Sequence, residues 1–154
     1  MKFYFIDTST MKDRIHRDLI TAIHSCDEVS IRALNSLEVA IEEVQNNSNG
    51  NLTDDNISKI ILKQIKQLQD NVVKYMDEGK KDLATAAALD VSVLNKYTPY
   101  VLDVAETEEA VSRAIYMTCA TSVNDINRIM TYLKNRYFIV SKKLILYLVK
   151  FHLE

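Results

Sequence analysis

The sequence has few of the residues that interrupt regular structure. Its 154 residues include two glycines, one proline and no tryptophan. A sheet-rich fold needs many tight turns, where glycine and proline are the usual residues, so their shortage favours a chain built from helices. Apolar residues make up 47% of the chain, which is enough for a core and argues against disorder throughout. The length suits one domain, or two small subdomains that share a core.

Long apolar runs and metal-binding cysteine spacings are also missing. The longest apolar candidate, residues 137–149, is interrupted by Lys142 and Lys143, so we expect no transmembrane helix and no membrane partner. Cys26 and Cys119 fit no Cys-x-x-Cys or zinc spacing. We therefore expect two buried thiols in a reducing compartment, which places the protein in the cytoplasm.

The sequence presents no recognisable catalytic centre. It contains no glycine-rich phosphate loop and no Gly-x-Ser-x-Gly motif. His16 and His24 would lie about 80° apart around a helix, which is a poor chelating pair. The adjacent carboxylates Asp54–Asp55 and Glu108–Glu109 point apart on a helix, so they do not form an acid–base pair. We expect no catalytic residues, no metal and no cofactor.

Apolar residues at helical spacing predict three N-terminal helices, at about 11–25, 28–45 and 54–78, with a polar loop at 46–51. Asp27 and Thr53 precede the second and third helices and are typical capping residues. The third helix has the longest stripe, and we expect it to form an antiparallel hairpin with the helix before it. This stripe consists of Ile57, Ile61, Ile65, Leu68, Val72 and Met76.

Residues 79–102 join the two halves of the chain. Gly79 ends one helix, and an alanine-rich helix is predicted over 80–97. Pro99 disfavours helical geometry at Thr98 and makes a rigid joint. The inward positions of the alanine-rich helix are predicted to be Leu83, Ala86, Ala87, Val91 and Leu94.

Three short helices are predicted after the joint, at about 104–117, 123–135 and 142–152, the last capped by Ser141. The predicted fold class is therefore all-α, with an N-terminal helical hairpin region at 1–98 joined to a C-terminal three-helix bundle at 99–154. Residues 1–7 form a short extended apolar arm, which either packs on the helices or mediates association into a homo-oligomer.

Charge is distributed unevenly. Residues 126–154 contain six Lys or Arg residues and one Glu, a net charge of +5, which leaves −7 for residues 1–125. Basic side chains neutralise phosphates, and aromatic side chains stack on unpaired bases. A solvated helix face with core aromatics explains the same residues, and the sequence leaves both interpretations open. The candidate RNA-binding residues are Arg128, Lys134, Arg136, Lys142, Lys143 and Lys150, interleaved with Tyr132, Tyr137 and Phe138.

Several short motifs, taken in order, resemble the YqeY family, whose C-terminal part is related to the tail domain of GatB, a subunit of the tRNA-dependent amidotransferase. The matching motifs are Leu52-Thr53-Asp54-Asp55, Ile65-Lys66-Gln67, Gly79 with Asp82-Leu83, Tyr97-Thr98-Pro99 and Asp125-Ile126. Within them, Gly79, Asp82, Tyr97 and Pro99 are the hinge and motif residues. Residues 135–141 lack the glycine that the family has before its last helix, so we expect the last turn to differ in shape.

The resemblance implies an all-helical protein whose C-terminal bundle contacts RNA. Our first hypothesis is a non-catalytic binding module for tRNA or for a tRNA-dependent enzyme. The second is a protein-interaction or assembly module that uses the apolar arm and the helix stripes. The third is an accessory to carbon–nitrogen ligation with glutamine as amido donor. Fold resemblance alone does not transfer the amidotransferase reaction, because that chemistry lies elsewhere in the enzyme.

Overall fold

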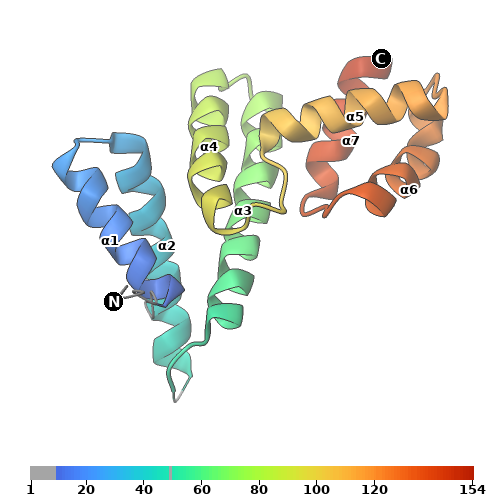
Figure 1. Ribbon diagram of the computed structural model, residues 1–154. Helices are drawn as coiled ribbons and strands as arrows, with labels where there is room; N and C mark the ends of the chain where they lie inside the picture. Colours follow the sequence, from blue (N-terminus) through green and yellow to red (C-terminus); the bar gives the residue numbers. More distant parts are fainter. Residues whose placement is uncertain (1–9, 49) are drawn as a thin grey trace, which may run out of the picture.

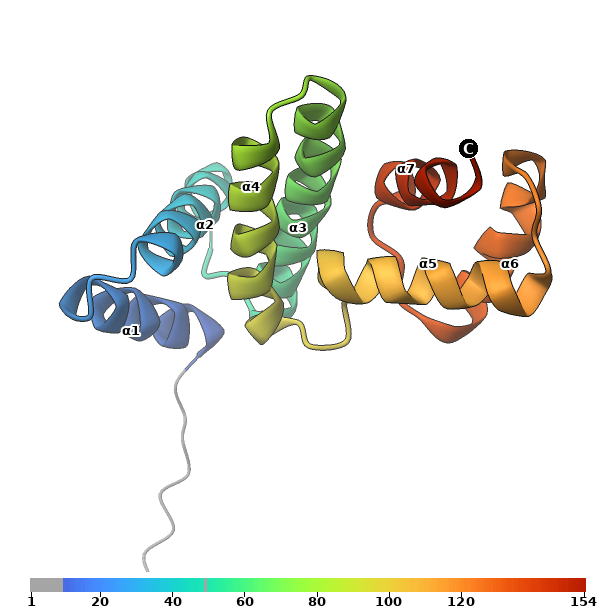
Figure 2. The same ribbon diagram turned by 90° about the horizontal axis from the view of Figure 1, so that it is seen from above.

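The computed structural model describes residues 10–48 and 50–154, and in these ranges the protein is all-α, as predicted (Figures 1 and 2). A single isolated parallel bridge, between Val101 and Phe138, is the one β-type pairing in the described residues. The predicted arm at residues 1–7 lies outside them. The helices are α1 (Met11–His24), α2 (Glu28–Asn47), α3 (Asp54–Asp77), α4 (Lys81–Leu94), α5 (Val104–Thr118), α6 (Ile126–Arg136) and α7 (Lys142–Leu153), with 3-10 turns η1 (Asn95–Tyr97) and η2 (Val123–Asp125).

Among the described helices, α1, α2, α3, α5 and α7 each begin at a residue whose side chain caps the first turn. The predicted caps Asp27, Thr53 and Ser141 each accept a hydrogen bond from a backbone N–H in the first turn of α2, α3 and α7. Asp103 begins α5 with a reciprocal capping box, in which the Glu106 side chain accepts from the Asp103 N–H. Local sequence therefore fixes where these helices start.

Three helices end in the same left-handed motif. Gly79 ends α3 with φ of +72°, and the Lys80 N–H donates to the Tyr75 carbonyl at 2.8 Å. Cys26 and Cys119 hold the equivalent position after α1 and α5, with φ of +56° and +54°. Both thiols are exposed, so the prediction of buried thiols was wrong. The reason is that each cysteine lies in a surface turn beyond the helix end, where its side chain points away from the core.

Replacing Cys119 with glycine is expected to raise the free energy of unfolding by about 0.5–1 kcal/mol. A side chain in the left-handed region costs about 1–2 kcal/mol, and the greater entropy of an unfolded glycine offsets part of the gain. Urea denaturation would measure the change. The matched control is Gly79→Ala, which introduces the same strain and should lower stability by about 1 kcal/mol. A destabilised Cys119→Gly variant would contradict this account of the turn.

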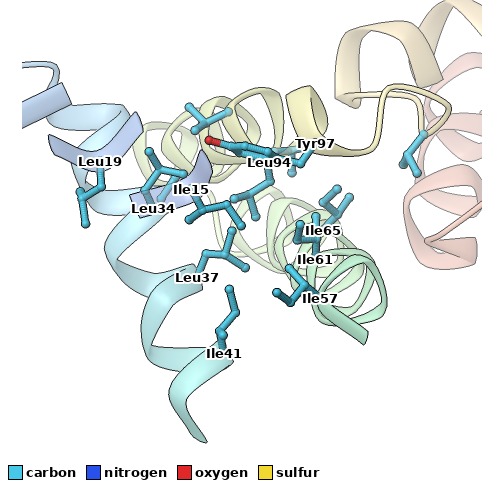
Figure 3. Close-up of a cluster of buried hydrophobic side chains, with 14 residues drawn as sticks. Ile15, Leu19, Leu34, Leu37, Ile41, Ile57, Ile61, Ile65, Leu94 and Tyr97 are labelled. Carbon is cyan, nitrogen blue, oxygen red and sulfur yellow. The ribbon is translucent and has the colours of Figure 1, made fainter. Parts of the chain in front are cut away.

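The N-terminal core lies where α1, α2, α3 and the end of α4 converge (Figure 3). Ile57, Ile61 and Ile65 of the α3 stripe are almost fully buried, as predicted. They face Leu34, Leu37 and Ile41 of α2, together with Ile15 of α1 and Leu94 of α4 (Figure 3).

The prediction that α3 forms a hairpin with α2 was wrong, because α3 pairs with α4 instead. The two helices meet near their connecting loop and then diverge, whereas α3 and α4 run side by side in both views (Figures 1 and 2). Ala84 and Ala87 are buried on α4, because small side chains allow the close approach. Ala87, Val91 and Leu94 are buried as predicted. Leu83 was predicted to point inward but is 48% exposed, and Ala84 is buried in its place.

A second core closes the C-terminal half. Ala110, Val111 and Ala114 of α5 pack with Ile129 and Leu133 of α6 and with the apolar face of α7. The α3 and α4 helices also reach this core, through Val72, Ala84 and Ala87. The two cores therefore share α3 and α4, and the proposed boundary at residue 98 stays a prediction. None of the helices described is both long enough and apolar enough to cross a bilayer.

Candidate nucleic-acid interface

The joint between the two cores is anchored by Tyr97. Its ring is buried, and its hydroxyl donates a short hydrogen bond of 2.5 Å to Asp18 Oδ2 on α1. Burial raises the pKa of the Tyr97 hydroxyl well above its usual value, and the hydrogen bond to the Asp18 carboxylate adds to this effect. The Arg14 guanidinium lies over the ring, 5.7 Å from its centroid. Tyr97 therefore ties α1 to the start of the joint.

Two amide side chains fix the segment that follows. Asn95 Nδ2 donates to the Val101 carbonyl, and Gln69 Nε2 donates to the Leu102 carbonyl at 3.1 Å. Gln69 is buried on α3, and sequence reasoning missed it because it is polar. Its spacing of four from Ile65 and three from Val72 was the signal that could have found it. These bonds support the prediction of a rigid joint.

The other hinge residues are at the surface. Gly79 provides the left-handed turn described above, and Pro99 is exposed at the start of the turn after Thr98. Asp82 is exposed in the first turn of α4, where a carboxylate is favourable for the helix dipole. The local structure explains why each of these three residues occupies its position, and the three do not converge on a common site.

All six candidate RNA-binding residues are exposed, but their surroundings differ. Arg128 is engaged within the protein, because its guanidinium donates to the Thr118 carbonyl at 3.1 Å and to Asp125 Oδ1 at 2.7 Å. The pKa of Asp125 falls to about 2, because its carboxylate accepts from the backbone N–H of Thr121, from Arg128 and from the N–H of Ser122. Arg128 thus stabilises the turn before α6.

Replacing Arg128 with alanine is expected to raise the pKa of Asp125 from about 2 toward 3.8 without reaching it, since the two backbone N–H donors remain. Because folding depresses this pKa, the carboxylate contributes stability above pH ~4 that is lost as the pH falls through the folded-state value. A carbon-detected NMR titration would measure the shift. Lys134→Ala is the control and should leave Asp125 unchanged. An unchanged pKa in Arg128→Ala would contradict the assigned contact.

The side chains of Lys134, Lys142 and Lys150 form no hydrogen bond or ion pair within residues 10–48 and 50–154. Arg136 lies over the Tyr132 ring, with its guanidinium carbon 3.8 Å from the ring centroid. This cation–π contact holds the guanidinium at the end of α6. Lys134 and Arg136 thus mark one basic region, at the end of α6.

Lys143 and Lys150 mark a second basic region, in a shallow groove between α3 and α7. They line it with Val73, Asp77, Leu146 and Tyr147. At the start of α7, the Ser141 hydroxyl donates to Asp70 Oδ1 at 2.6 Å, and Lys66 pairs with the same carboxylate. Burial raises the pKa of Asp70, but the hydrogen bonds from Ser141 and Lys66 outweigh it, and the net shift is downward. The structure thus brings Lys143 and Lys150 together but leaves Arg128 elsewhere.

Tyr100 and Phe138 form an exposed aromatic pair that sequence reasoning missed. They come from the joint and from the α6–α7 connection, and their rings meet edge to face with centroids 5.4 Å apart. Phe138 was noted among the basic residues, whereas Tyr100 lies far from it in the sequence. Only the fold brings the two together, so no local signal could have identified the pair.

No group of three or more His, Cys, Asp or Glu side chains suited to a metal ion occurs in the described part of the chain. His16 instead pairs with Glu38, with 3.0 Å between Nδ1 and Oε1.

A family model described as Yqey-like protein matches residues 12–150, which is nearly the whole chain. No curated protein matches the sequence.

Proposed function

The chain belongs to the YqeY-like family, and from this premise we propose that it is a non-catalytic binding module that contacts tRNA through its C-terminal helices α5–α7. The observation that carries the proposal is the set of exposed cations on α6 and α7. The side chains of Lys134, Lys142 and Lys150 have no hydrogen-bond or ion-pair partner in the described residues. Such side chains are available to phosphates, and each phosphate they neutralise releases counterions.

The uneven distribution of charge supports the same function. Residues 126–154 carry a net charge of +5 on a chain whose total is −2. Phosphates are therefore attracted to the part of the bundle formed by α6 and α7 and repelled by the rest of the molecule. The relation of this part of the family to the GatB tail makes tRNA the RNA to test first.

The test is fluorescence anisotropy with labelled tRNA at two salt concentrations. The double variant Lys142→Glu/Lys143→Glu is expected to bind about tenfold more weakly at low salt and to show a shallower dependence on salt, because phosphate contacts are lost. Glutamates in the first turn of α7 suit the helix dipole, so the variant should still fold.

The matched control is Lys59→Glu/Lys63→Glu, which makes the same charge change on exposed positions of α3. We expect it to keep the wild-type affinity within about threefold, since these residues lie outside the proposed interface. Equal losses in both variants would indicate a response to net charge alone. Undetectable binding of tRNA by the wild-type protein at low salt would refute the proposal.

An assembly function is the second candidate. Ile20 and Ile23 on α1 and Val39 and Val44 on α2 are each more than 40% exposed. Exposed apolar side chains of this kind occur at protein interfaces. Light scattering of the full chain and of a chain without residues 1–7 would test it. If both the full chain and the shortened chain were monomeric and bound no other protein, this result would count against an assembly function.

A further inference from the structure

The Tyr100–Phe138 pair joins two exposed apolar residues from distant parts of the sequence, and their rings meet edge to face. Tyr100 is 54% exposed and Phe138 is 49% exposed, although their edges are in contact. Each residue therefore keeps about half of its surface open to solvent, and the edge-to-face geometry holds the two rings in a defined orientation.

The backbone beneath the pair is fixed on both sides. Val101, directly after Tyr100, is fully buried and pairs with Phe138 through the isolated bridge. The Val101 carbonyl also accepts a hydrogen bond from the Asn95 side chain. Phe138 itself borders a small hollow, together with Gln69 and Leu102. A ligand that contacts these rings would order little additional structure, which lowers the entropic cost of binding.

The charges that neighbour Phe138 in the sequence favour an anionic partner. Residues 134–143 contain Lys134, Arg136, Lys142 and Lys143 and no acidic residue. Near Tyr100, the negative charges of Asp103 and Glu106 remain, and the N-terminus of α5, which these residues cap, partly offsets them. Aromatic rings beside cations are the combination that binds a nucleic acid strand, with bases on the rings and phosphates on the cations.

We propose that Tyr100 and Phe138 form a stacking platform for an unpaired base, so that the RNA recognised here is a single-stranded segment. This inference rests on the proposed function, because it assumes that RNA contacts the bundle. A duplex would not suit the platform, because its bases are already stacked and paired. An unpaired base can instead leave the strand and lie against a ring.

The experiment compares binding of a 12-nucleotide single strand and of a blunt duplex of the same length by fluorescence anisotropy. In Tyr100→Leu/Phe138→Leu, the affinity for the single strand is expected to fall about tenfold or more, because each stacked base contributes strongly. Affinity for the duplex and the salt dependence should stay unchanged, since the cations remain. The ring-retaining variant Tyr100→Phe should bind as the wild type does.

The control is Tyr116→Leu, which removes a ring that is 81% exposed on α5 and should leave binding unchanged. Urea melts of each variant establish that it is folded. Undiminished single-strand affinity in a folded double variant would overturn the platform while leaving the proposed function intact. The platform would also be overturned if the wild type bound the duplex more tightly than the single strand. The same holds if the double variant lost a bound protein but kept its affinity for RNA. Failure of the wild type to bind either RNA would remove both proposals.

Discussion

Replacing Tyr97 with alanine is expected to lower the free energy of unfolding by about 3–5 kcal/mol, the range found for buried aromatic residues. Tyr97 is only 7% exposed and belongs to the N-terminal core with Ile15 and Leu94 (Figure 3). The substitution leaves a cavity at the joint and removes the hydroxyl that donates to Asp18. Urea denaturation followed by circular dichroism would measure the loss.

The control for this variant is Tyr97→Phe, which keeps the ring and removes only the hydrogen bond. It should cost about 1 kcal/mol at neutral pH. Folding raises the pKa of Tyr97, so the protonated hydroxyl contributes stability that is fully present below pH ~10. This contribution is lost as the pH rises through the folded-state pKa, which distinguishes the wild type from Tyr97→Phe. Tyr97→Phe should therefore lose less stability above pH ~10 than the wild type. If the wild type and Tyr97→Phe lost the same stability above pH ~10, the assigned burial of the hydroxyl would be contradicted.

Replacing Ile65 with alanine is expected to lower the free energy of unfolding by about 2–5 kcal/mol. Ile65 is fully buried near the middle of α3, and α3 contributes to both cores. Since the cores share this helix, we expect one cooperative transition in the wild type and in the variant, seen equally by circular dichroism and tyrosine fluorescence.

The control is Lys63→Ala, an exposed position on the same helix, which should change stability by less than about 0.5 kcal/mol. A small effect of Ile65→Ala would mean that α3 does not organise the core. Two separate transitions in the wild type would instead show that the halves before and after the joint fold independently.

The sequence predicts the helices well because their signals are local. Asp27, Thr53 and Ser141 act within one turn, and the isoleucines of α3 repeat at the helical period. The partner of α3 could not be predicted in this way, since it depends on the approach of α4 across Ala84 and Ala87. Alanine-rich segments show weak periodicity, which also explains why Leu83 was placed on the wrong face.

The candidate site is predictable only in part. The accumulation of cations after residue 126 is visible in the sequence, and so is the spacing of three that pairs Asp125 with Arg128. The grouping of Lys143 with Lys150 against α3, and the meeting of Tyr100 with Phe138, depend on tertiary structure. Long-range contacts of this kind leave no periodic signal in a single sequence.

The most direct test of the central claim, that tRNA contacts the C-terminal bundle, is lysine footprinting. The protein would be acetylated with and without saturating tRNA, and modification at each lysine would be read by mass spectrometry. We predict that Lys134, Lys142 and Lys150 are protected by tRNA, while Lys59 and Lys63 on α3 react as they do in the free protein. Protection of Lys59 and Lys63 with unchanged reactivity at the other three would contradict the account.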